Sequence, residues 1–290
     1  MVTAIESNKA GEIEPRTLLV FDMDGTLLNA ESRISAYTGE TLKLLEAAGI
    51  AYTVATGRTL QATRGPITGH RFALPHIVKN GAAIWCPEKG DYSHTHLLTQ
   101  TELWHVLAAF TLQDITPFVF TLEDDGRHAV YHGPLKNSSE KKLAELFEDE
   151  RALPLEPLSA MPTQAQVINV SAMGPDTAIT HIIDNVRDEP LLVAYTGTAI
   201  EAKNLRWLDI HHHQGSKGNA ITTLREEHAF DHIIVFGDGD NDVSMFEIAD
   251  EAYAPDNADQ EVKALATAVI GHHNEDGVAR YLRERFNLAG

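Results

Sequence analysis

The sequence predicts an α/β protein with a doubly wound parallel sheet and a second, inserted α+β domain. Three observations support this fold class. Short apolar runs alternate with amphipathic helical segments early in the chain, the same alternation returns near its end, and the stretch between follows another pattern. The length of 290 residues also exceeds the usual size of about 150 residues for one domain.

The early part of the chain predicts two β-α-β units. The apolar run at 17–21 predicts a buried strand, helical spacing over 35–48 predicts a helix that stops before a glycine, and 50–56 predicts the next strand. A helix over 59–65 and a strand within 76–81 form the second unit. Strands joined by such helices are expected to run parallel in one sheet.

The late part of the chain repeats this alternation. A helix is predicted over 218–228, a buried strand over 232–238 and a helix over 241–249. Short strands follow near 251–254 and 268–270. Together with the early units, these elements predict a single doubly wound core.

The stretch from 85 to 208 mixes helices and strands in another order. Strands 117–121 and 128–132 flank Asp124-Asp125-Gly126, which predicts a hairpin turn. The helices predicted in this stretch are 99–112, 138–149 and 175–187, and its other strands are 166–172, 191–195 and 206–210. The chain therefore divides into a leader (1–16), a core domain (17–84 plus 209–290) and an inserted domain (85–208).

Composition excludes several partners and compartments. With 23 Lys and Arg against 42 Asp and Glu, the formal charge is -19, so the surface field repels nucleic acid and acidic membranes, and neither is expected as a partner. A single cysteine, Cys86, and the lack of an apolar leader or an 18-residue apolar run favour a cytoplasmic location. Nothing in the sequence indicates an oligomeric state.

Two acidic clusters each follow a predicted buried strand. Asp22 and Asp24 are two positions apart, so both side chains can leave an extended backbone on the same side. One carboxylate can then act as nucleophile or metal ligand while the other transfers a proton. Alone, the pattern is equally typical of a solvated turn.

The second cluster, Asp238-Gly-Asp-Asn-Asp242, is expected to face the first across the carboxyl edge of the sheet. Crowded carboxylates need a cation, and Mg²⁺ suits carboxylates combined with a substrate phosphate. A calcium loop is disfavoured, because the glycine expected at its sixth position is Leu27 in one cluster and Val243 in the other.

Two further loops contain phosphate-binding candidates. Thr56-Gly57-Arg58 ends a predicted strand and precedes a helix, which places a hydroxyl, a flexible backbone and a helix N-terminus together. Lys217 precedes another helix, in a sequence that is not a Walker A loop. Any one of these signals is weak, and their joint occurrence makes them informative.

These four segments, DMDGTL at 22–27, ATGR at 55–58, SKG at 216–218 and GDGDND at 237–242, resemble the ordered motifs of the haloacid dehalogenase (HAD) superfamily. Asn80-Gly81-Ala82 and the segment 274–279 make the chain most similar to its Cof-type phosphatases, subfamily IIB. The position of the insertion, between Thr56 and Lys217, matches what that superfamily calls a C2 cap, a domain that selects the substrate.

The resemblance implies a role for each motif residue. Asp22 would be the nucleophile that forms an aspartyl-phosphate, and Asp24 the general acid and base. Thr56, the Gly57 amide and Lys217 would bind the phosphoryl group. Mg²⁺ would be held by Asp22, the Asp24 main-chain carbonyl, Asp238 and Asp242, and the further candidates for substrate contact are Arg58, Asn80 and Asn241.

The implied reaction is hydrolysis of a small phosphorylated metabolite, a phosphomonoester such as a sugar phosphate. A phosphomutase with the same site stays open, and a non-catalytic metabolite-binding protein is a weaker alternative because no motif residue is missing. Haloacid dehalogenation is disfavoured, because those relatives lack the aspartate found here at position 24.

Other conspicuous residues have simpler interpretations. Three consecutive histidines, 211–213, cannot all face one ion on an extended segment, since side chains alternate. Cys86 is expected to be structural. Trp85 and Trp207 lie near the predicted domain junctions, where packing is the main expectation and substrate contact a secondary one.

Overall fold

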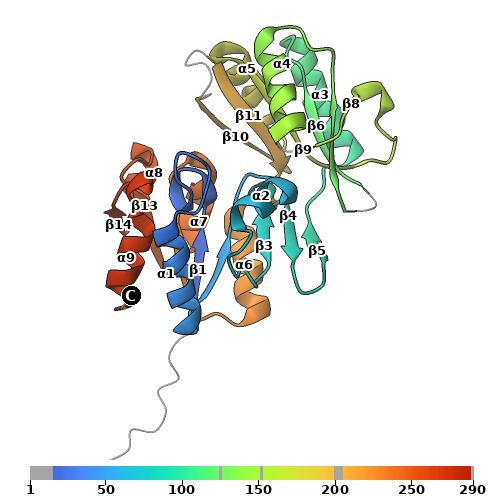
Figure 1. The fold of residues 1–290 in the computed structure, drawn as a ribbon. Coiled ribbons are helices and arrows are strands. Elements are labelled where there is room, and N and C mark those ends of the chain that lie inside the picture. The colour runs from blue at the N-terminus through green and yellow to red at the C-terminus, as the bar shows by residue number, and fades with distance from the viewer. Residues whose placement is uncertain (1–15, 124–125, 151–152, 199–204, 289–290) are drawn as a thin grey trace, which may run out of the picture.

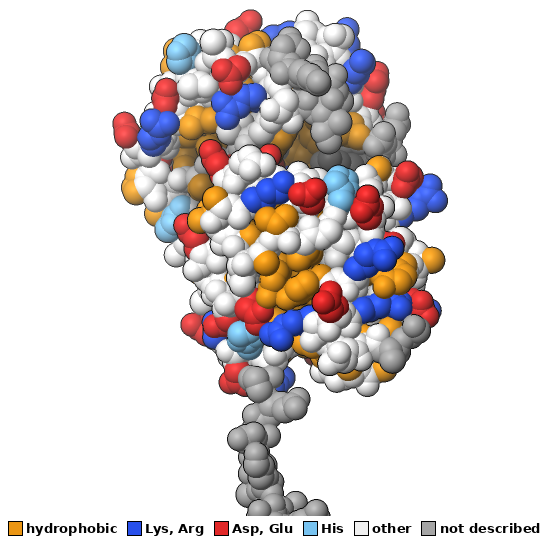
Figure 2. Space-filling model, turned by 90° about the vertical axis from the view of Figure 1, so that its left-hand side faces the viewer, with side chains coloured by type: hydrophobic (Ala, Val, Ile, Leu, Met, Phe, Trp, Pro, Cys, Tyr) orange, Lys and Arg blue, Asp and Glu red, His pale blue; other side chains and the backbone are white. Residues whose placement is uncertain are grey.

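The computed structural model describes residues 16–123, 126–150, 153–198 and 205–288, which form two lobes (Figure 1). The predicted leader, apart from Arg16, and the turn residues Asp124 and Asp125 lie outside the described residues. On the face seen in Figure 2, acidic and basic side chains are interspersed and a hollow separates the lobes. No helix in the described part of the chain is long and apolar enough to cross a membrane.

The lower lobe is built on a five-stranded parallel sheet of order β14-β13-β12-β1-β2. Its strands are β1 (Thr17–Phe21), β2 (Ala51–Val54), β12 (His232–Phe236), β13 (Glu251–Pro255) and β14 (Ala268–Ile270). Phe21 is in register with both Phe236 and Val54, so β1 and its two neighbours end at the same level. The loops that follow these strands therefore meet at one edge of the sheet.

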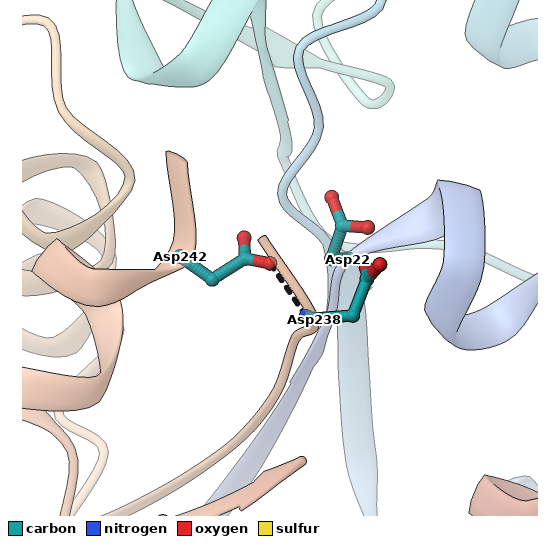
Figure 3. A group of neighbouring side chains, drawn as sticks. All are labelled: Asp22, Asp238 and Asp242. Atoms are coloured by element: carbon teal, nitrogen blue, oxygen red, sulfur yellow. Dashed lines mark hydrogen bonds between the residues drawn. The ribbon is translucent and has the colours of Figure 1, made fainter. Parts of the chain in front are cut away.

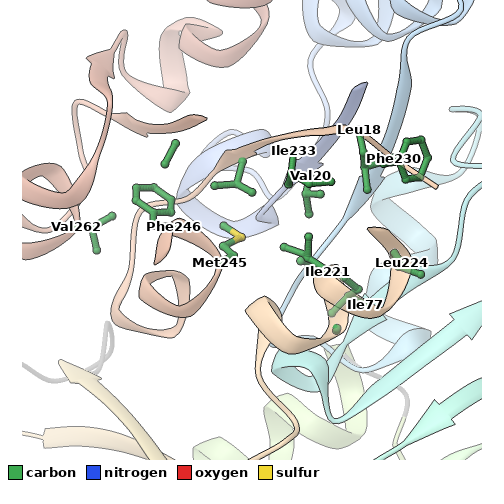
Figure 4. Packing of buried hydrophobic residues seen from close by; sticks show 14 of the residues in the cluster. Leu18, Val20, Ile77, Ile221, Leu224, Phe230, Ile233, Met245, Phe246 and Val262 are labelled. Carbon is green, nitrogen blue, oxygen red and sulfur yellow. The ribbon is translucent and has the colours of Figure 1, made fainter. Parts of the chain in front are cut away.

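Helices cover both faces of this sheet, which confirms the doubly wound prediction. Alternate residues of β1 serve the two faces: Leu18 and Val20 pack into one cluster (Figure 4) and Leu19 and Phe21 into the other. The first face is covered by α6 (Lys217–His228), α7 (Val243–Ile248) and α8 (Gln260–Leu265), and the second by α1 (Ala36–Ala47), α2 (Leu60–Ile67) and α9 (Gly277–Arg285).

A small antiparallel sheet was not predicted. Residues 76–81 were expected to continue the parallel sheet, but β3 (His76–Val78) pairs with that sheet at one isolated bridge, between Ala55 and Ile77. It pairs instead with β4 (Ala83–Cys86), which pairs with β5 (Asp91–Thr95). Positive φ values of 48° at Lys79 and 56° at Asn80 end the strand, because an extended chain cannot pass through that conformation.

The upper lobe is a six-stranded sheet of order β10-β11-β9-β6-β7-β8. Its pairs are antiparallel except β7 with β8, and the predicted hairpin joins β6 to β7. The strands are β6 (Phe118–Leu122), β7 (His128–His132), β8 (Leu155–Pro157), β9 (Gln166–Pro175), β10 (Leu192–Thr198) and β11 (Leu205–His212). The inserted lobe is thus α+β, and the predicted boundaries at 84/85 and 208/209 fall inside β4 and β11.

Three helices complete this lobe. α3 (Gln100–Leu112) and α5 (Asp176–Val186) pack on one face of the sheet, over residues such as Val119, Val170 and Leu208. α4 (Ser138–Glu145) and the turn Leu146–Glu150 pack on the other, where Phe147 meets Phe118 and Phe120. The helix predicted over 138–149 therefore ends earlier, at Glu145, and continues as a wider turn.

A buried seam joins the lobes. The Tyr92 hydroxyl on β5 is 2.8 Å from Nε2 of His128 on β7, and Ala82, Leu122 and Ile168 pack together beside this pair. Burial, with a smaller effect of the Lys79 charge, lowers the pKa of His128 to about 3. The seam holds the upper sheet over the carboxyl edge of the parallel sheet.

Candidate active site

The loop after β1 interlocks with the loop after β12. The Asp22 amide donates to the Phe236 carbonyl at 2.8 Å, and residues Met23–Leu27 form a wide turn closed by the bond from the Leu28 amide to the Met23 carbonyl. Gly25 has φ of 78°, and an added side chain there would collide with the Asp238 carboxylate. The Thr26 hydroxyl donates to that carboxylate at 2.9 Å. The two predicted acidic clusters therefore form one site.

Lys217 lies between two of the acidic side chains. It is fully buried at the first position of α6, and its Nζ is 2.5 Å from Oδ1 of Asp22 and 2.5 Å from Oδ1 of Asp242. The Ser216 hydroxyl caps the helix by accepting from the Asn219 amide at 3.1 Å. The cap and the helix direction fix where the lysine side chain enters the site.

Three carboxylates converge beside this lysine (Figure 3). Each of Asp22, Asp238 and Asp242 offers one oxygen, and these oxygens lie within 4.8 Å of one another. The Oδ2 atom of Asp242 accepts from the amides of Asp238 at 2.8 Å and Gly239 at 3.1 Å. These bonds orient Asp242 and shape its loop.

The pKa values of these groups show unbalanced negative charge. Burial raises the pKa of Asp22 well above its usual value, and repulsion by Asp242 and Asp238 adds to this effect against the opposing pull of Lys217. Burial and then Asp242 raise the pKa of Asp238 to about 7. Burial alone would lower the pKa of Lys217, but Asp22 and Asp242 raise it.

A divalent cation fits this arrangement. Carboxylate oxygens are the ligands that Mg²⁺ prefers, and the charge of one lysine does not match two buried carboxylates and a third that is partly buried. Asp22, Asp238 and Asp242 are thus the side chains able to hold a metal. The predicted contribution of the Asp24 main-chain carbonyl stays a prediction.

Asp24 is set apart from this group. Its side chain is 56% exposed and lies against Arg58, whose Nε donates to Oδ2 at 2.7 Å and whose Nη2 donates to Oδ1 at 2.5 Å. Both residues line the cleft. Arg58 was predicted as a substrate contact, and its described partner is this carboxylate.

The remaining predicted residues meet through hydrogen bonds. The Thr56 hydroxyl accepts from the Arg58 amide at 3.1 Å, and the Thr56 carbonyl accepts from the Asn80 amide at 2.9 Å. The Asn80 side-chain oxygen accepts from Nδ2 of Asn241 at 2.9 Å, and a side chain at Gly57 would press on this oxygen at 3.0 Å. The structure thus brings all the predicted loops together.

These residues form the floor of a cleft of about 640 Å³ between the lobes. Its upper wall comes from the inserted lobe and includes Phe120, Phe147, Ser171, Trp207 and Asp209. Sequence reasoning missed Asp209 and did not single out Lys79, which also lines the cleft. No motif marks such positions, since strand residues become wall residues only through the sheet that they join.

The conspicuous aromatic residues separate into two kinds. Trp207 lines the cleft, whereas Trp85 packs edge-to-face on Tyr92 with its ring 4.9 Å from the Arg64 guanidinium. Substrate contact thus stays a prediction for Trp207, and packing describes Trp85. Cys86 is a buried free thiol, as expected.

The side chains of the three consecutive histidines, 211–213, lie in different environments. Nε2 of the buried His211 is 3.4 Å from Nδ2 of Asn80, the His212 ring stacks on His96, and His213 is exposed. The group of possible metal ligands found among the described residues is the aspartate trio rather than these rings.

The segment 274–279 supports the first acidic loop from outside. The Asn274 side chain accepts from the Ala30 amide at 2.7 Å. Asp276 accepts from the hydroxyls of Ser35 at 2.5 Å and Thr38 at 3.0 Å at the start of α1. This late segment therefore anchors the chain between β1 and α1 and does not line the cleft.

Comparison with known proteins identifies the family. A family model described as haloacid dehalogenase-like hydrolase matches residues 19–282. YwtE of Bacillus subtilis, a 5-amino-6-(5-phospho-D-ribitylamino)uracil phosphatase, is 27% identical over 91% of this chain and 96% of its own. The pyridoxal phosphate phosphatase YbhA of Escherichia coli is 24% identical over 91% of this chain and 97% of its own.

Solved structures share the architecture. A haloacid dehalogenase-like hydrolase from B. subtilis superposes with a TM-score of 0.75 at 22% identity, covering 92% of this chain and 98% of that one. A HAD subclass IIB sugar phosphatase superposes with a TM-score of 0.74 at 22% identity, covering 94% and 100%. The chain therefore belongs to the haloacid dehalogenase-like hydrolase family and is a phosphatase of its Cof-type branch.

Proposed function

We propose that this phosphatase hydrolyses a small phosphorylated metabolite, a phosphomonoester such as a sugar phosphate, through an aspartyl-phosphate on Asp22. The observation that carries the proposal is the position of Asp22. It is a buried carboxylate that contacts Lys217, belongs to the acidic trio and still lines the cleft. A nucleophile needs this combination of access to substrate and neighbouring positive charge.

In the first step, a carboxylate oxygen of Asp22 attacks phosphorus and the bond from phosphorus to the leaving oxygen breaks, with its electron pair going to that oxygen. Lys217, the Thr56 hydroxyl and the Gly57 amide bind the transferring group. Asp24 gives its proton to the leaving oxygen. Its exposed position at the cleft suits this task once it turns from Arg58.

In the second step, Asp24 takes a proton from a water molecule, whose oxygen attacks phosphorus. The bond between phosphorus and the Asp22 oxygen breaks, which restores the Asp22 carboxylate and releases inorganic phosphate. The burial of Asp22 protects this intermediate from bulk solvent.

Asp22, Asp238 and Asp242, with the Asp24 main-chain carbonyl, would hold Mg²⁺. The bound ion supplies positive charge that offsets the repulsion between a carboxylate nucleophile and a phosphate. The raised pKa values of Asp22 and Asp238 support this assignment, because they arise from burial and mutual repulsion that a cation would relieve.

We assign substrate selection to the inserted domain, predicted over 85–208, because its sheet forms the upper wall of the cleft. The named relatives support a small metabolite as substrate: one acts on a phosphorylated ribitylaminouracil and another on pyridoxal phosphate. These relatives are phosphatases, so they also favour water as the final acceptor of the phosphoryl group. A phosphomutase would transfer that group to a second hydroxyl of the substrate.

The test is Asp22→Asn, which keeps the shape of the side chain and removes the nucleophile. With p-nitrophenyl phosphate and Mg²⁺, we expect turnover to fall by about 10⁴-fold or more while the circular dichroism spectrum stays unchanged. Asp259→Asn, elsewhere in the cleft, is the matched control. If the Asp22 variant kept about a tenth of the wild-type rate, this result would contradict the mechanism.

A further inference from the structure

A buried lysine reaches from the core to the upper lobe across the cleft. Lys79 directly follows β3, lines the cleft and is 2% exposed. Its Nζ lies 4.0 Å from the centre of the Phe120 ring, which belongs to β6 in the upper sheet. The ammonium group therefore lies beside the wall that a leaving group must contact.

Backbone hydrogen bonds hold Lys79 next to the predicted phosphate-binding loop, residues 56–58. Lys79 and Asn80 are consecutive non-glycine residues with positive φ, a strained conformation that folds retain mainly at functional sites. The Lys79 amide donates to the Arg58 carbonyl at 2.9 Å, and the Asn80 amide donates to the Thr56 carbonyl at 2.9 Å. The lysine thus starts from a fixed point next to the predicted phosphate contacts.

The cations in and beneath the cleft contact different residues. Lys217 contacts Asp22 and Asp242, and Arg58 contacts Asp24. The charge of Lys79 also acts on the upper sheet. It adds to burial in lowering the pKa of His128 and that of His211, where Asp209 has the opposite effect. This positive charge therefore acts on the leaving-group side of the cleft.

We propose that Lys79 is a specificity-determining residue that recognises a negatively charged oxygen group on the leaving group. This proposal rests on the proposed function. Asp209, Asp240 and Asp259, which lie outside the metal trio, also line the cleft and would repel such a group in the absence of a nearby cation. The apolar wall of Phe120 and Phe147 excludes water and strengthens the attraction between ammonium and anion.

The test uses two substrates of equal shape, 4-carboxyphenyl phosphate and its neutral amide, 4-carbamoylphenyl phosphate. Lys79→Met keeps the length of the side chain and removes its charge. We expect kcat/KM for the carboxylate to fall about ten-fold or more, and that for the amide to change by less than about three-fold. Lys79→Arg should retain part of the preference.

Lys43→Met is the control, because it removes one positive charge from the exposed surface of α1. It should leave both substrates unaffected. Equal falls for both substrates in Lys79→Met would overturn the proposal and indicate that Lys79 only supports Phe120, and unchanged kinetics would overturn it as well. The 4-phosphonophenyl analogue tells whether a carboxylate or a phosphate-like group is preferred, and preference for either supports the proposal.

Binding measurements separate this proposal from the mechanism. Calorimetry with 4-carboxybenzylphosphonate and its amide reports recognition without turnover. A wild-type preference for the carboxylate that Lys79→Met abolishes supports the role of Lys79 even if Asp22 proves not to be the nucleophile. The absence of that preference in the wild type overturns the proposal, whatever the turnover results show.

Discussion

The two sheets of this phosphatase contribute to its cleft in different ways. The parallel sheet contributes loops: Asp22 follows β1 directly and Asp238 follows β12 after Gly237, at an edge where strand ends align. The antiparallel sheet contributes a face: Trp207 and Asp209 of β11 line the cleft, whereas Ile210 packs beneath α3 and α5. Loop residues can be recognised as motifs, but residues of a strand face cannot.

The two contributions also differ in their internal contacts. The core residues form a continuous network of ion pairs and short hydrogen bonds around Lys217. The upper wall combines aromatic rings with an isolated polar group in which Asp209 accepts from Asn169 at 3.2 Å and from Ser171. Changes in the first region should therefore abolish chemistry, and changes in the second should alter stability or selectivity.

Lys217→Met is the strongest test of this division. It leaves the buried carboxylates of Asp22 and Asp242 without their shared cation, so we expect kcat to fall by about 10³-fold. Steady-state kinetics with saturating Mg²⁺ measures the effect, with Lys43→Met as control. A loss of less than about ten-fold would show that the network is structural rather than catalytic.

Asp242→Asn should act mainly on the metal. The substitution keeps the side-chain shape but removes one of the three converging carboxylates. We expect the Mg²⁺ concentration for half-maximal activity to rise about 10-fold to 100-fold, as for other changes around a bound metal. Asp259→Asn, which lines the cleft outside the trio, should leave it unchanged. Equal Mg²⁺ dependence in both variants would remove Asp242 from the metal site.

Gly81→Ala tests how tightly the loops of the core are joined. Gly81 has φ of 97°, and an added side chain would collide with the Ser216 carbonyl. Gly69 has φ of 86°, and a side chain added there would meet no atom within 4 Å, so Gly69→Ala introduces backbone strain without a collision. We expect a loss of about 2–4 kcal/mol of unfolding free energy for Gly81→Ala and about 1 kcal/mol for Gly69→Ala. Thermal denaturation compares them, and equal losses would mean that the loops can separate freely.

The seam between the lobes should respond to acid. The pKa of His128 is about 3 in the folded protein, below that of an unfolded histidine, because the ring is buried. The unfolded state therefore binds the proton first, so the contribution to stability is complete above about pH 6.5 and is lost as the pH falls toward 3, by up to about 1.4 kcal/mol per pH unit.

Urea unfolding at about pH 7.5 and about pH 5 measures this loss, which His128→Gln should reduce. The exposed His213 is the control, and His213→Gln should behave as the wild type. A change in stability between the two pH values that is the same in the wild type and in His128→Gln would show that His128 titrates normally.

Much of the core could be predicted from the sequence because its signals are local. Buried strands are continuous apolar runs, and the candidate site residues follow within two positions, as at Asp22 after β1 and Asp238 after β12. Hydrogen bonds at 2.9 Å now join Asn80 to both Thr56 and Asn241, in agreement with the expected convergence of the motifs. Their catalytic roles stay proposals.

The rest depends on contacts between residues distant in sequence. β5, with the sequence DYSHT, is too polar to read as a strand, yet it pairs with β4 because Tyr92 faces the buried His128. The positive φ values of Lys79 and Asn80 set the end of β3. Hydrogen bonds from their amides to the carbonyls of Arg58 and Thr56 hold these two residues in place. No periodicity in the sequence reports either effect.

The acidic lining of the cleft has a consequence for the rate of substrate capture. Long-range repulsion between a phosphate dianion and a protein of net charge -19 slows the encounter, while the buried cations attract the substrate mainly once it is inside the cleft, where salt screens charges less. Moderate ionic strength shortens the reach of the first effect more than that of the second. Salt, which usually weakens the capture of charged ligands, should therefore speed association here.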